Sequence, residues 1–175
     1  MSYQSNIMKI PPYSTFPKIC SDSVILRQIK TGDLSDILEI SFYDAKLALN
    51  VDEASQMLAK IDFDYQQGSS IHFGIAHPET NEIVGTVGYY RGFENGIGEL
   101  GCVLKSSFRG YGFMTMAMKL AVEYGLNVIG LVKVIAITDK QNIKTVNLLN
   151  RVGFTQTSDG LNNDEVTFEF NKIQV

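Results

Sequence analysis

The sequence predicts an α+β domain in which about four helices flank a mixed, mostly antiparallel sheet of six or seven strands. Three observations predict this class. Short apolar runs rich in β-branched residues recur along the chain and predict strands. Other segments place apolar residues three and four positions apart, as amphipathic helices do. The runs between residues 71 and 104 are separated only by turn-forming residues, which indicates an antiparallel meander, whereas later runs alternate with helical segments.

The composition bounds the class of protein. A chain of 175 residues, 45% of them hydrophobic, can form one domain with a substantial core. Its net charge of −4 argues against a nucleic-acid partner. Residues 1–10 lack the pattern of a signal peptide and no run is long enough to span a bilayer, so we expect a cytoplasmic protein without a membrane partner. Neither the two cysteines nor the two histidines have metal-ligand spacing, and no metal is expected.

The N-terminal half predicts one strand, two helices and three further strands. Prolines at positions 11, 12 and 17 indicate an extended arm over residues 1–20, so that residues 21–175 form a single domain. A strand is expected at 24–29, and Thr31 or Asp33 could cap the helix after it. Apolar spacing then predicts helices at 33–46 and 52–67 and strands at 71–76, 82–91 and 99–104.

The C-terminal half predicts an alternation of helices and strands followed by a hairpin. A helix follows the glycines at 110 and 112 and ends near Gly125. The nearly continuous apolar run at 131–137 predicts a strand buried on both faces. One more helix ends at Gly153, and two last strands are expected at 154–157 and 165–170.

The chain is organised around residues 99–115, ELGCVLKSSFRGYGFMT, which predict a strand, a polar turn and a Gly-rich loop that opens into a helix. The start of a helix carries unpaired N–H groups and a partial positive charge, and glycines let an anion approach the backbone. The loop lacks the lysine of a nucleoside-triphosphate loop and the spacing of a dinucleotide fingerprint. We therefore expect residues 109–115 to hold a phosphate-bearing cofactor; the alternative is a tight turn without a ligand.

Four segments together resemble the GNAT N-acetyltransferases, and most closely their RimJ/RimL group. ELGCVL at 99–104 with RGYGFMTMA at 109–117 resembles motif A of that family. The other segments are VILR at 24–27 with Asp33, IVGTVG at 83–88, and residues 142–154 with the pattern NxxTxxLLxRxGF. They occur in the order of the family and span about residues 22–170.

The resemblance implies that acetyl-CoA is the co-substrate and that the strands at 99–104 and 131–137 diverge to admit it. The pantetheine arm would pair with the backbone of Cys102, Val103 and Leu104, as an added strand does. The pyrophosphate would lie on the N–H groups of seven loop residues: Arg109, Gly110, Tyr111, Gly112, Phe113, Met114 and Thr115. The family usually has a small residue at the position of Met114, which departs from the pattern. Asn142 matches an asparagine that contacts the cofactor arm, although it could equally cap its own helix.

The resemblance also supplies candidates for the catalytic groups. Transfer to an amine needs a base that removes a proton, and Glu99 matches the strand carboxylate of the family. Thr145 stands where the RimJ/RimL group often has a serine proposed to protonate the leaving thiolate. Glu99 could instead be a solvated strand residue and Thr145 a packed one. Cys102 has no base beside it in the sequence, so a buried apolar role is favoured over a nucleophile. Either Tyr89 or Tyr90 could face the acceptor, depending on the pleat.

The sequence thus predicts an acetyl-CoA-dependent N-acetyltransferase that acts by direct transfer in a ternary complex. The acceptor would be a primary amine, on a protein or peptide N-terminus or on a small molecule such as a polyamine, and a homodimer is left open. One alternative is a CoA-binding module without catalysis, which would bind CoA but release no thiol. Another is a nucleotide site, at which ATP would compete with CoA.

Overall fold

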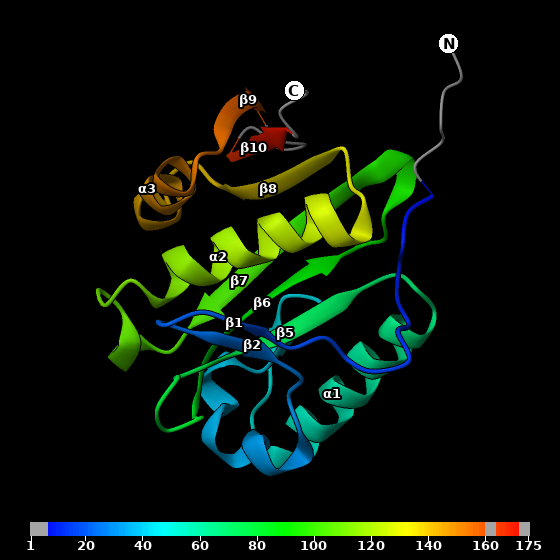
Figure 1. Ribbon diagram of the computed structural model, residues 1–175. Helices are drawn as coiled ribbons and strands as arrows, with labels where there is room; N and C mark the ends of the chain where they lie inside the picture. Colours follow the sequence, from blue (N-terminus) through cyan, green and yellow to red (C-terminus); the bar gives the residue numbers. More distant parts are fainter. Residues whose placement is uncertain (1–6, 160–163, 172–175) are drawn as a thin grey trace.

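One eight-stranded sheet organises the computed structural model, which describes residues 7–159 and 164–171 (Figure 1). The strand order is β1-β2-β5-β6-β7-β8-β10-β9, and β7 and β8 form the parallel pair within it. The predicted mixed, mostly antiparallel sheet is confirmed, with the short β1 in the N-terminal arm as an additional strand. The bounds are β1 Ile19–Cys20, β2 Ile25–Arg27, β5 Ile71–Ala76, β6 Ile83–Tyr90, β7 Ile97–Leu104, β8 Lys133–Asp139, β9 Thr155–Asp159 and β10 Glu165–Asn171.

The predicted meander is present as β5, β6 and β7, paired antiparallel in that order. Its register places Tyr90 opposite Glu99, and Gly88 opposite both His72 and Gly101. Directly opposed residues share a face of the sheet. Tyr90 and Glu99 therefore lie side by side on one face of the meander. The neighbouring row on that face consists of His72, Gly88 and Gly101.

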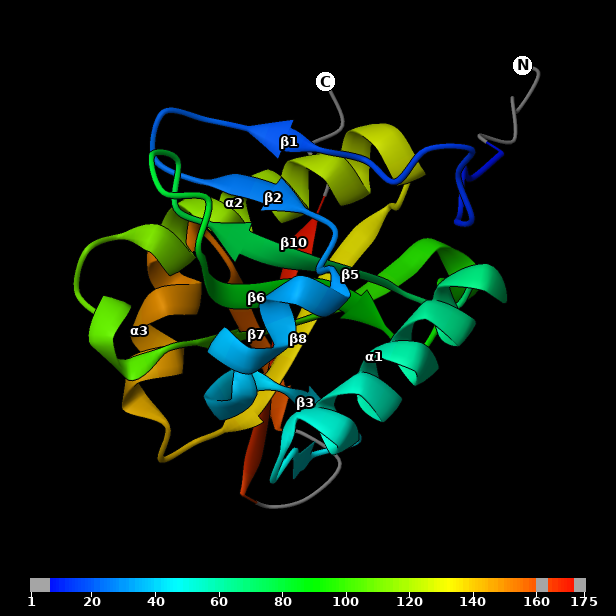
Figure 2. The same ribbon diagram turned by 90° about the horizontal axis from the view of Figure 1, so that it is seen from below.

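Helices cover both faces of the sheet (Figures 1 and 2). The helices α2 (Phe113–Tyr124) and α3 (Ile143–Val152) pack into the larger core, and α1 (Val51–Gln66) contributes to a smaller core on the other face. The larger core combines small residues of α2, Ala117 and Ala121, with large residues of the strands, Phe73, Tyr89 and Phe168. Burial of both apolar faces is the main stabilising contribution to such a layered domain.

The helix expected at 33–46 is absent, and that expectation was wrong. The segment forms two 3-10 turns, η1 (Thr31–Asp36) and η2 (Leu38–Ile40), followed by a hairpin of β3 (Phe42–Tyr43) and β4 (Lys46–Leu47). The two residues at the tip of the hairpin, Asp44 and Ala45, have φ values of 50° and 60°, which a right-handed helix does not allow. Serine and aspartate at 33, 35, 36 and 41 favour turns over helix interiors, which explains the outcome.

The cap expected for that segment takes another form. Asp33 does not begin a helix; its carboxylate accepts a hydrogen bond from the backbone N–H of Lys30 at 2.8 Å. Both of its oxygens also pair with the guanidinium of Arg27 at 2.9 Å. This interaction with Arg27, on β2, lowers the pKa of Asp33 below its ordinary value. Arg27 and Asp33, which belong to the motif at 24–33, thus form a bidentate ion pair. This pair holds η1 against β2 of the sheet.

After the meander, the predicted helices occur where expected. α2 ends at Tyr124 and continues as a π-helical turn, η5 (Gly125–Ile129). A Cβ atom at position 125 would overlap the Tyr89 hydroxyl, which donates a hydrogen bond to the carbonyl of Ala121 at 2.8 Å. α3 ends at Gly153, whose φ of 108° suits glycine. The turn expected between the last two strands lies partly outside the described residues.

The strands β7 and β8 pair over only part of their length. Ile97, Gly98 and Glu99 lie opposite Lys133, Val134 and Ile135, and no partners are recorded beyond that point. β7 nevertheless continues to Leu104, and β8 continues to Asp139 in full register with β10. The predicted divergence of these strands is confirmed, and it leaves the β8-facing edge of residues 100–104 without a neighbouring strand. None of the helices described is both long and apolar enough to cross a membrane.

Candidate functional site

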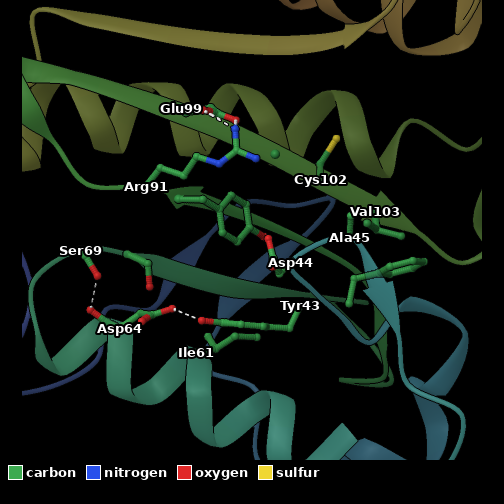
Figure 3. A pocket seen from close by; sticks show the side chains of 14 residues that line it. Tyr43, Asp44, Ala45, Ile61, Asp64, Ser69, Arg91, Glu99, Cys102 and Val103 are labelled. Atoms are coloured by element: carbon green, nitrogen blue, oxygen red, sulfur yellow. Dashed lines mark hydrogen bonds and ion pairs between the residues drawn. The ribbon is translucent and has the colours of Figure 1, made fainter. Parts of the chain in front are cut away.

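A cavity of about 610 Å³ lies between the meander and α1, next to the diverging end of β7. Figure 3 shows Glu99 and Arg91 on one side of it and Asp64 of α1 with Tyr43 of β3 on the other. The sheet forms one wall of the cavity through residues on β6 and β7. The β3–β4 hairpin and the C-terminal part of α1 form the opposite wall. Its lining is Phe42, Tyr43, Asp44, Ala45, Ile61, Asp64, Ser69, Ser70, Tyr90, Arg91, Glu99, Gly101, Cys102 and Val103.

Tyr90, not Tyr89, faces this cavity. The side chain of Tyr89 is fully buried toward α2, where its hydroxyl bonds to Ala121. Tyr90 lies on the opposite face, and its ring covers Gly101, where a Cβ atom would come within 2.9 Å of the ring. A side chain at position 101 would displace the Tyr90 ring, so glycine there leaves room for this ring beside the cavity. The sequence left this choice open because it depends on the pleat.

Glu99, predicted as the base, lines the cavity and is held by Arg91. One guanidinium nitrogen of Arg91, Nη1, donates to Oε1 at 2.9 Å and to Oε2 at 3.2 Å. The Arg91 side chain is 73% exposed and that of Glu99 only 22%. Arg91 is therefore open to solvent, whereas Glu99 is largely covered at the wall of the cavity. Arg91 follows β6 directly with a φ of 63°, and no motif in the sequence assigned it to the site.

Two further carboxylates, from Asp44 and Asp64, line the same cavity. Asp64 accepts a hydrogen bond from the Tyr43 hydroxyl at 3.1 Å, which ties the hairpin to α1. Neither residue was predicted from the sequence. Asp44 lies in a segment expected to be helical, and Asp64 lies within the helix predicted at 52–67, to which no site residue was assigned. An aspartate that follows apolar Ile61 by three positions was the available signal, because i and i+3 share a helix face.

The Gly-rich loop leads into α2 as expected. Gly110 and Gly112 have φ values of 87° and 85°, in the left-handed region that favours glycine. A Cβ atom added at either position would meet nothing within 4 Å, so the loop borders open space. Gly112 is the N-cap, offers no side-chain cap, and no acidic residue occupies the first turn of α2. Within residues 7–159 and 164–171 no ion pair involves Arg109, so this exposed side chain and the first N–H groups of α2 present positive charge there.

Neighbouring side chains fix the rest of the loop. Met114 is 8% exposed and packs in the core, so its size does not obstruct the backbone. The ring of Phe113 lies 5.5 Å from that of His77 and 5.9 Å from that of Phe108. Thr115 accepts a hydrogen bond from Arg151 of α3 at 3.4 Å. Tyr111 extends into solvent with 76% of its surface exposed.

The strand residues predicted to meet the cofactor, Cys102, Val103 and Leu104, form the unpaired end of β7. Cys102 and Val103 also line the cavity. The Cys102 sulfur lies 3.9 Å from Sδ of Met118 on α2, and Figure 3 shows it directed away from the cavity centre. Burial raises the pKa of the Cys102 thiol to about 12. The group is a protonated thiol at neutral pH, which agrees with the predicted apolar role.

Asn142 and Thr145 lie at the start of α3 and do not line the cavity. The Asn142 side chain accepts a hydrogen bond from the Thr145 N–H at 3.3 Å and so caps the helix. Capping was one of the two roles left open for Asn142. Thr145 is half-buried, and α3 packs against both α2 and β8. The structure therefore places these two residues on the β8 side of the diverging strands and Glu99 on the β7 side.

Metal ligands do not gather in the parts of the chain that the structure describes. Among those residues no three His, Cys, Asp or Glu side chains come together in an arrangement that could hold an ion.

Comparison with known proteins identifies the family. Residues 23–155 match the model described as "Acetyltransferase (GNAT) domain". The chain is 26% identical to YoaA of Bacillus subtilis, described as an uncharacterized N-acetyltransferase, over 147 residues that cover 79% of this chain and 83% of that one.

Two solved structures from Vibrio cholerae show the same fold. A putative ribosomal-protein-serine acetyltransferase superposes with a TM-score of 0.77 at 15% identity, covering 89% of this chain and 97% of the other. A variant of the SpeG spermidine N-acetyltransferase superposes with a TM-score of 0.71 at 18% identity, covering 86% and 95%. With the family model spanning most of the chain, the diverging β7 and β8, the Gly-rich start of α2 and the sheet order have one explanation: this chain belongs to the GNAT acetyltransferases.

Proposed function

We propose that the protein transfers the acetyl group of acetyl-CoA directly to a primary amine bound in the cavity between β7 and α1. The observation that carries the proposal is the position of β7. Its unpaired edge at residues 100–104 adjoins the Gly-rich loop on one side, and residues of the same strand line the cavity on the other. A donor along that edge and an acceptor in the cavity would meet at one strand, as direct transfer in a ternary complex requires.

The residues of the loop and strand fit an anionic donor. The free N–H groups at the start of α2, the open space beside Gly110 and Gly112, and the exposed Arg109 suit a pyrophosphate. The free edge of Cys102, Val103 and Leu104 suits the amide groups of a pantetheine arm. When bound, acetyl-CoA supplies a thioester whose carbonyl carbon an amine can attack.

The chain's own groups would handle the protons. Glu99 is the proposed base: its carboxylate takes a proton from the acceptor ammonium so that the neutral amine can attack. Arg91 must first release the carboxylate, which its high exposure allows. Thr145, on the opposite side of the divergence, is proposed to give its hydroxyl proton to the departing thiolate while its oxygen takes up the remaining proton of the attacking nitrogen. The hydroxyl is thereby restored, as the N–C bond forms and the C–S bond breaks. Cys102 takes no part, because its thiol is protonated and directed toward Met118.

The acceptor is proposed to be a primary amine on a small molecule or a peptide N-terminus. The structural neighbours are named for both kinds of substrate, ribosomal-protein serine and spermidine. The motifs at 99–117 and 142–154 support membership of the RimJ/RimL group. A cavity that carries three carboxylates and one guanidinium favours a cationic acceptor.

The test is the release of free thiol from acetyl-CoA in the presence of a panel of amines, with a thiol reagent as the readout. We expect release that depends on both the amine and the enzyme, together with formation of the N-acetyl product. Competition of CoA binding by ATP at comparable affinity would instead indicate a nucleotide site. Tight CoA binding without thiol release across the panel would overturn catalysis.

A further inference from the structure

Buried polar atoms without a partner gather beside the cavity. Three such side-chain atoms occur among the described residues: Oγ of Ser70 and the two ring nitrogens of His72. Ser70 and His72 are two positions apart and point to the same face of the sheet. Buried polar groups in native proteins almost always have hydrogen-bond partners, and exceptions call for an explanation. Their concentration at one place indicates that something outside the protein completes the hydrogen bonding there.

Ser70 lies at the cavity itself. It lines the cavity, and only 5% of the residue is exposed. It precedes β5, and extending the register of Ile71 with Tyr89 by one residue places it opposite Tyr90. A ligand group that enters the cavity is therefore the available partner for the Ser70 hydroxyl.

His72 lies behind the cavity and adds no charge to it. It lines a second, smaller cavity of about 20 Å³, and Phe42 and Ile61 line both cavities and so separate them. The Tyr90 ring packs edge-on against His72, with 5.5 Å between centroids. Burial lowers the pKa of His72 to about 4, so the imidazole is neutral at pH 7. A space of this size suits one water molecule as the partner of its nitrogens.

The charge beside Ser70 is negative and unneutralised. Within the described chain, Glu99 forms an ion pair with Arg91, but neither Asp44 nor Asp64 takes part in one. Asp64 uses Oδ2 to accept the Tyr43 hydrogen bond, which leaves Oδ1 available. Lys60 is the nearby cation on α1, and its ammonium lies over the Tyr43 ring at 5.3 Å from the centroid. The wall opposite Glu99 thus offers hydrogen-bond acceptors and negative charge.

We propose that this wall is a second subsite, in which Asp64 and Ser70 hold a protonated amino group of the acceptor while another amine of the same molecule reaches Glu99. The inference rests on the proposed function, since it takes the cavity as the acceptor site. An ammonium has three N–H donors and no acceptor, which suits a carboxylate oxygen and a hydroxyl oxygen. The rings of Phe42, Tyr43 and Tyr90 line the space between and suit methylene groups. The acceptor class is therefore an aliphatic diamine or a longer cation of that kind.

The test compares diamines with monoamines of equal chain length in the presence of CoA. Binding of 1,4-diaminobutane, 1,5-diaminopentane and 1,6-diaminohexane is measured by titration calorimetry beside the corresponding 1-aminoalkanes. We expect at least one diamine to bind about tenfold more tightly than its monoamine. Asp64→Asn should remove most of that ratio, and Ser70→Ala should lower it several-fold. Asp62→Asn is the matched control, because it removes the same charge from an exposed position of α1 that does not line the cavity, and the ratio should be unchanged.

The outcomes separate this inference from the proposed function. Equal affinity for diamines and monoamines, or equal loss of the ratio in Asp64→Asn and Asp62→Asn, overturns the subsite. Selective binding of diamines without thiol release keeps the subsite and overturns catalysis. Thiol release with diamines and monoamines at equal kcat/KM keeps catalysis and overturns the subsite. Thermal unfolding of each variant checks that its fold is intact.

Discussion

Nη1 of Arg91 lies 2.9 Å from Oε1 and 3.2 Å from Oε2 of Glu99, so the proposed base already has a partner before any acceptor arrives. An acceptor ammonium must therefore compete with a guanidinium for the same carboxylate. The pair is mostly exposed on the arginine side, and such pairs contribute less than about 1 kcal/mol. Displacing Arg91 from Glu99 therefore reduces the binding free energy of the acceptor slightly but does not prevent binding.

Removing Arg91 should make acceptor binding easier. In Arg91→Ala, we expect KM for the amine to fall by about two- to fivefold, with little change in the free energy of unfolding. Steady-state kinetics at low ionic strength provide the measurement. Lys119→Ala removes an equal charge from an exposed position on α2 and should leave KM unchanged. A rise in KM for Arg91→Ala would mean that the guanidinium itself binds the acceptor.

Glu99→Gln tests the base through its pH dependence. At neutral pH the acceptor is protonated, so loss of the carboxylate should lower kcat/KM by about a hundredfold or more. At pH values near the pKa of the free amine, about 10, the amine loses its proton unaided and the deficit should shrink. The measurement is the pH profile of kcat/KM for both proteins. A deficit that is constant across the range would remove Glu99 from the proton transfer.

Gly112→Asp tests the donor loop. A side chain at this left-handed position costs roughly 1 kcal/mol of stability but meets no neighbouring atom, so the fold should persist. The added carboxylate would lie at the N–H groups proposed for the pyrophosphate, and CoA affinity should fall by about a hundredfold or more. Gly112→Ala introduces the same backbone strain without the charge. Its CoA affinity therefore shows how much of the loss in Gly112→Asp is due to strain alone. Calorimetric titration with CoA measures both variants, and normal binding by Gly112→Asp would show the loop assignment to be wrong.

His72 should make the fold sensitive to acid. Burial lowers the pKa of His72 from 6.5 to about 4. Between these pH values the imidazole is protonated in the unfolded chain but largely neutral in the folded chain. The free energy of unfolding should therefore fall by about 3 kcal/mol as the pH drops from 6.5 to 4. Chemical denaturation across this range measures the slope. His72→Leu should lose this part of the slope, and an unchanged slope would show that folding does not lower the pKa of His72.

The sequence predicted the meander and the turn of the Gly-rich loop into α2 because both depend on local signals. Short apolar runs separated by turn residues define β5 and β6, and glycine is favoured at the left-handed positions 110 and 112. The role of the loop in holding a donor stays a prediction. The segment at 33–46 was mispredicted because its spacing of apolar residues, Leu34, Ile37 and Leu38, fits successive 3-10 turns as well as a helix.

The acceptor side could not be predicted from local signals. Asp44, Asp64 and Arg91 come from a hairpin tip, a helix and a strand end, and only the tertiary fold brings them together. The same holds for Tyr90, whose orientation follows from register rather than composition.

The cavity and the Gly-rich loop, which lie on either side of the divergence of β7 and β8, are formed by different regions of the sequence. Every residue that lines the acceptor cavity lies between positions 42 and 103, whereas the Gly-rich loop and the start of α3 lie at 109–115 and 142–145. The two regions meet at the unpaired end of β7, where Cys102 and Val103 line the cavity and also belong to the edge proposed for the donor. Under the proposed function, substitutions between positions 42 and 101 should change which amine is accepted and leave the Gly-rich loop and α3 unaltered. If the cavity holds the acceptor as proposed, the choice of amine can change independently of the binding of the acetyl donor.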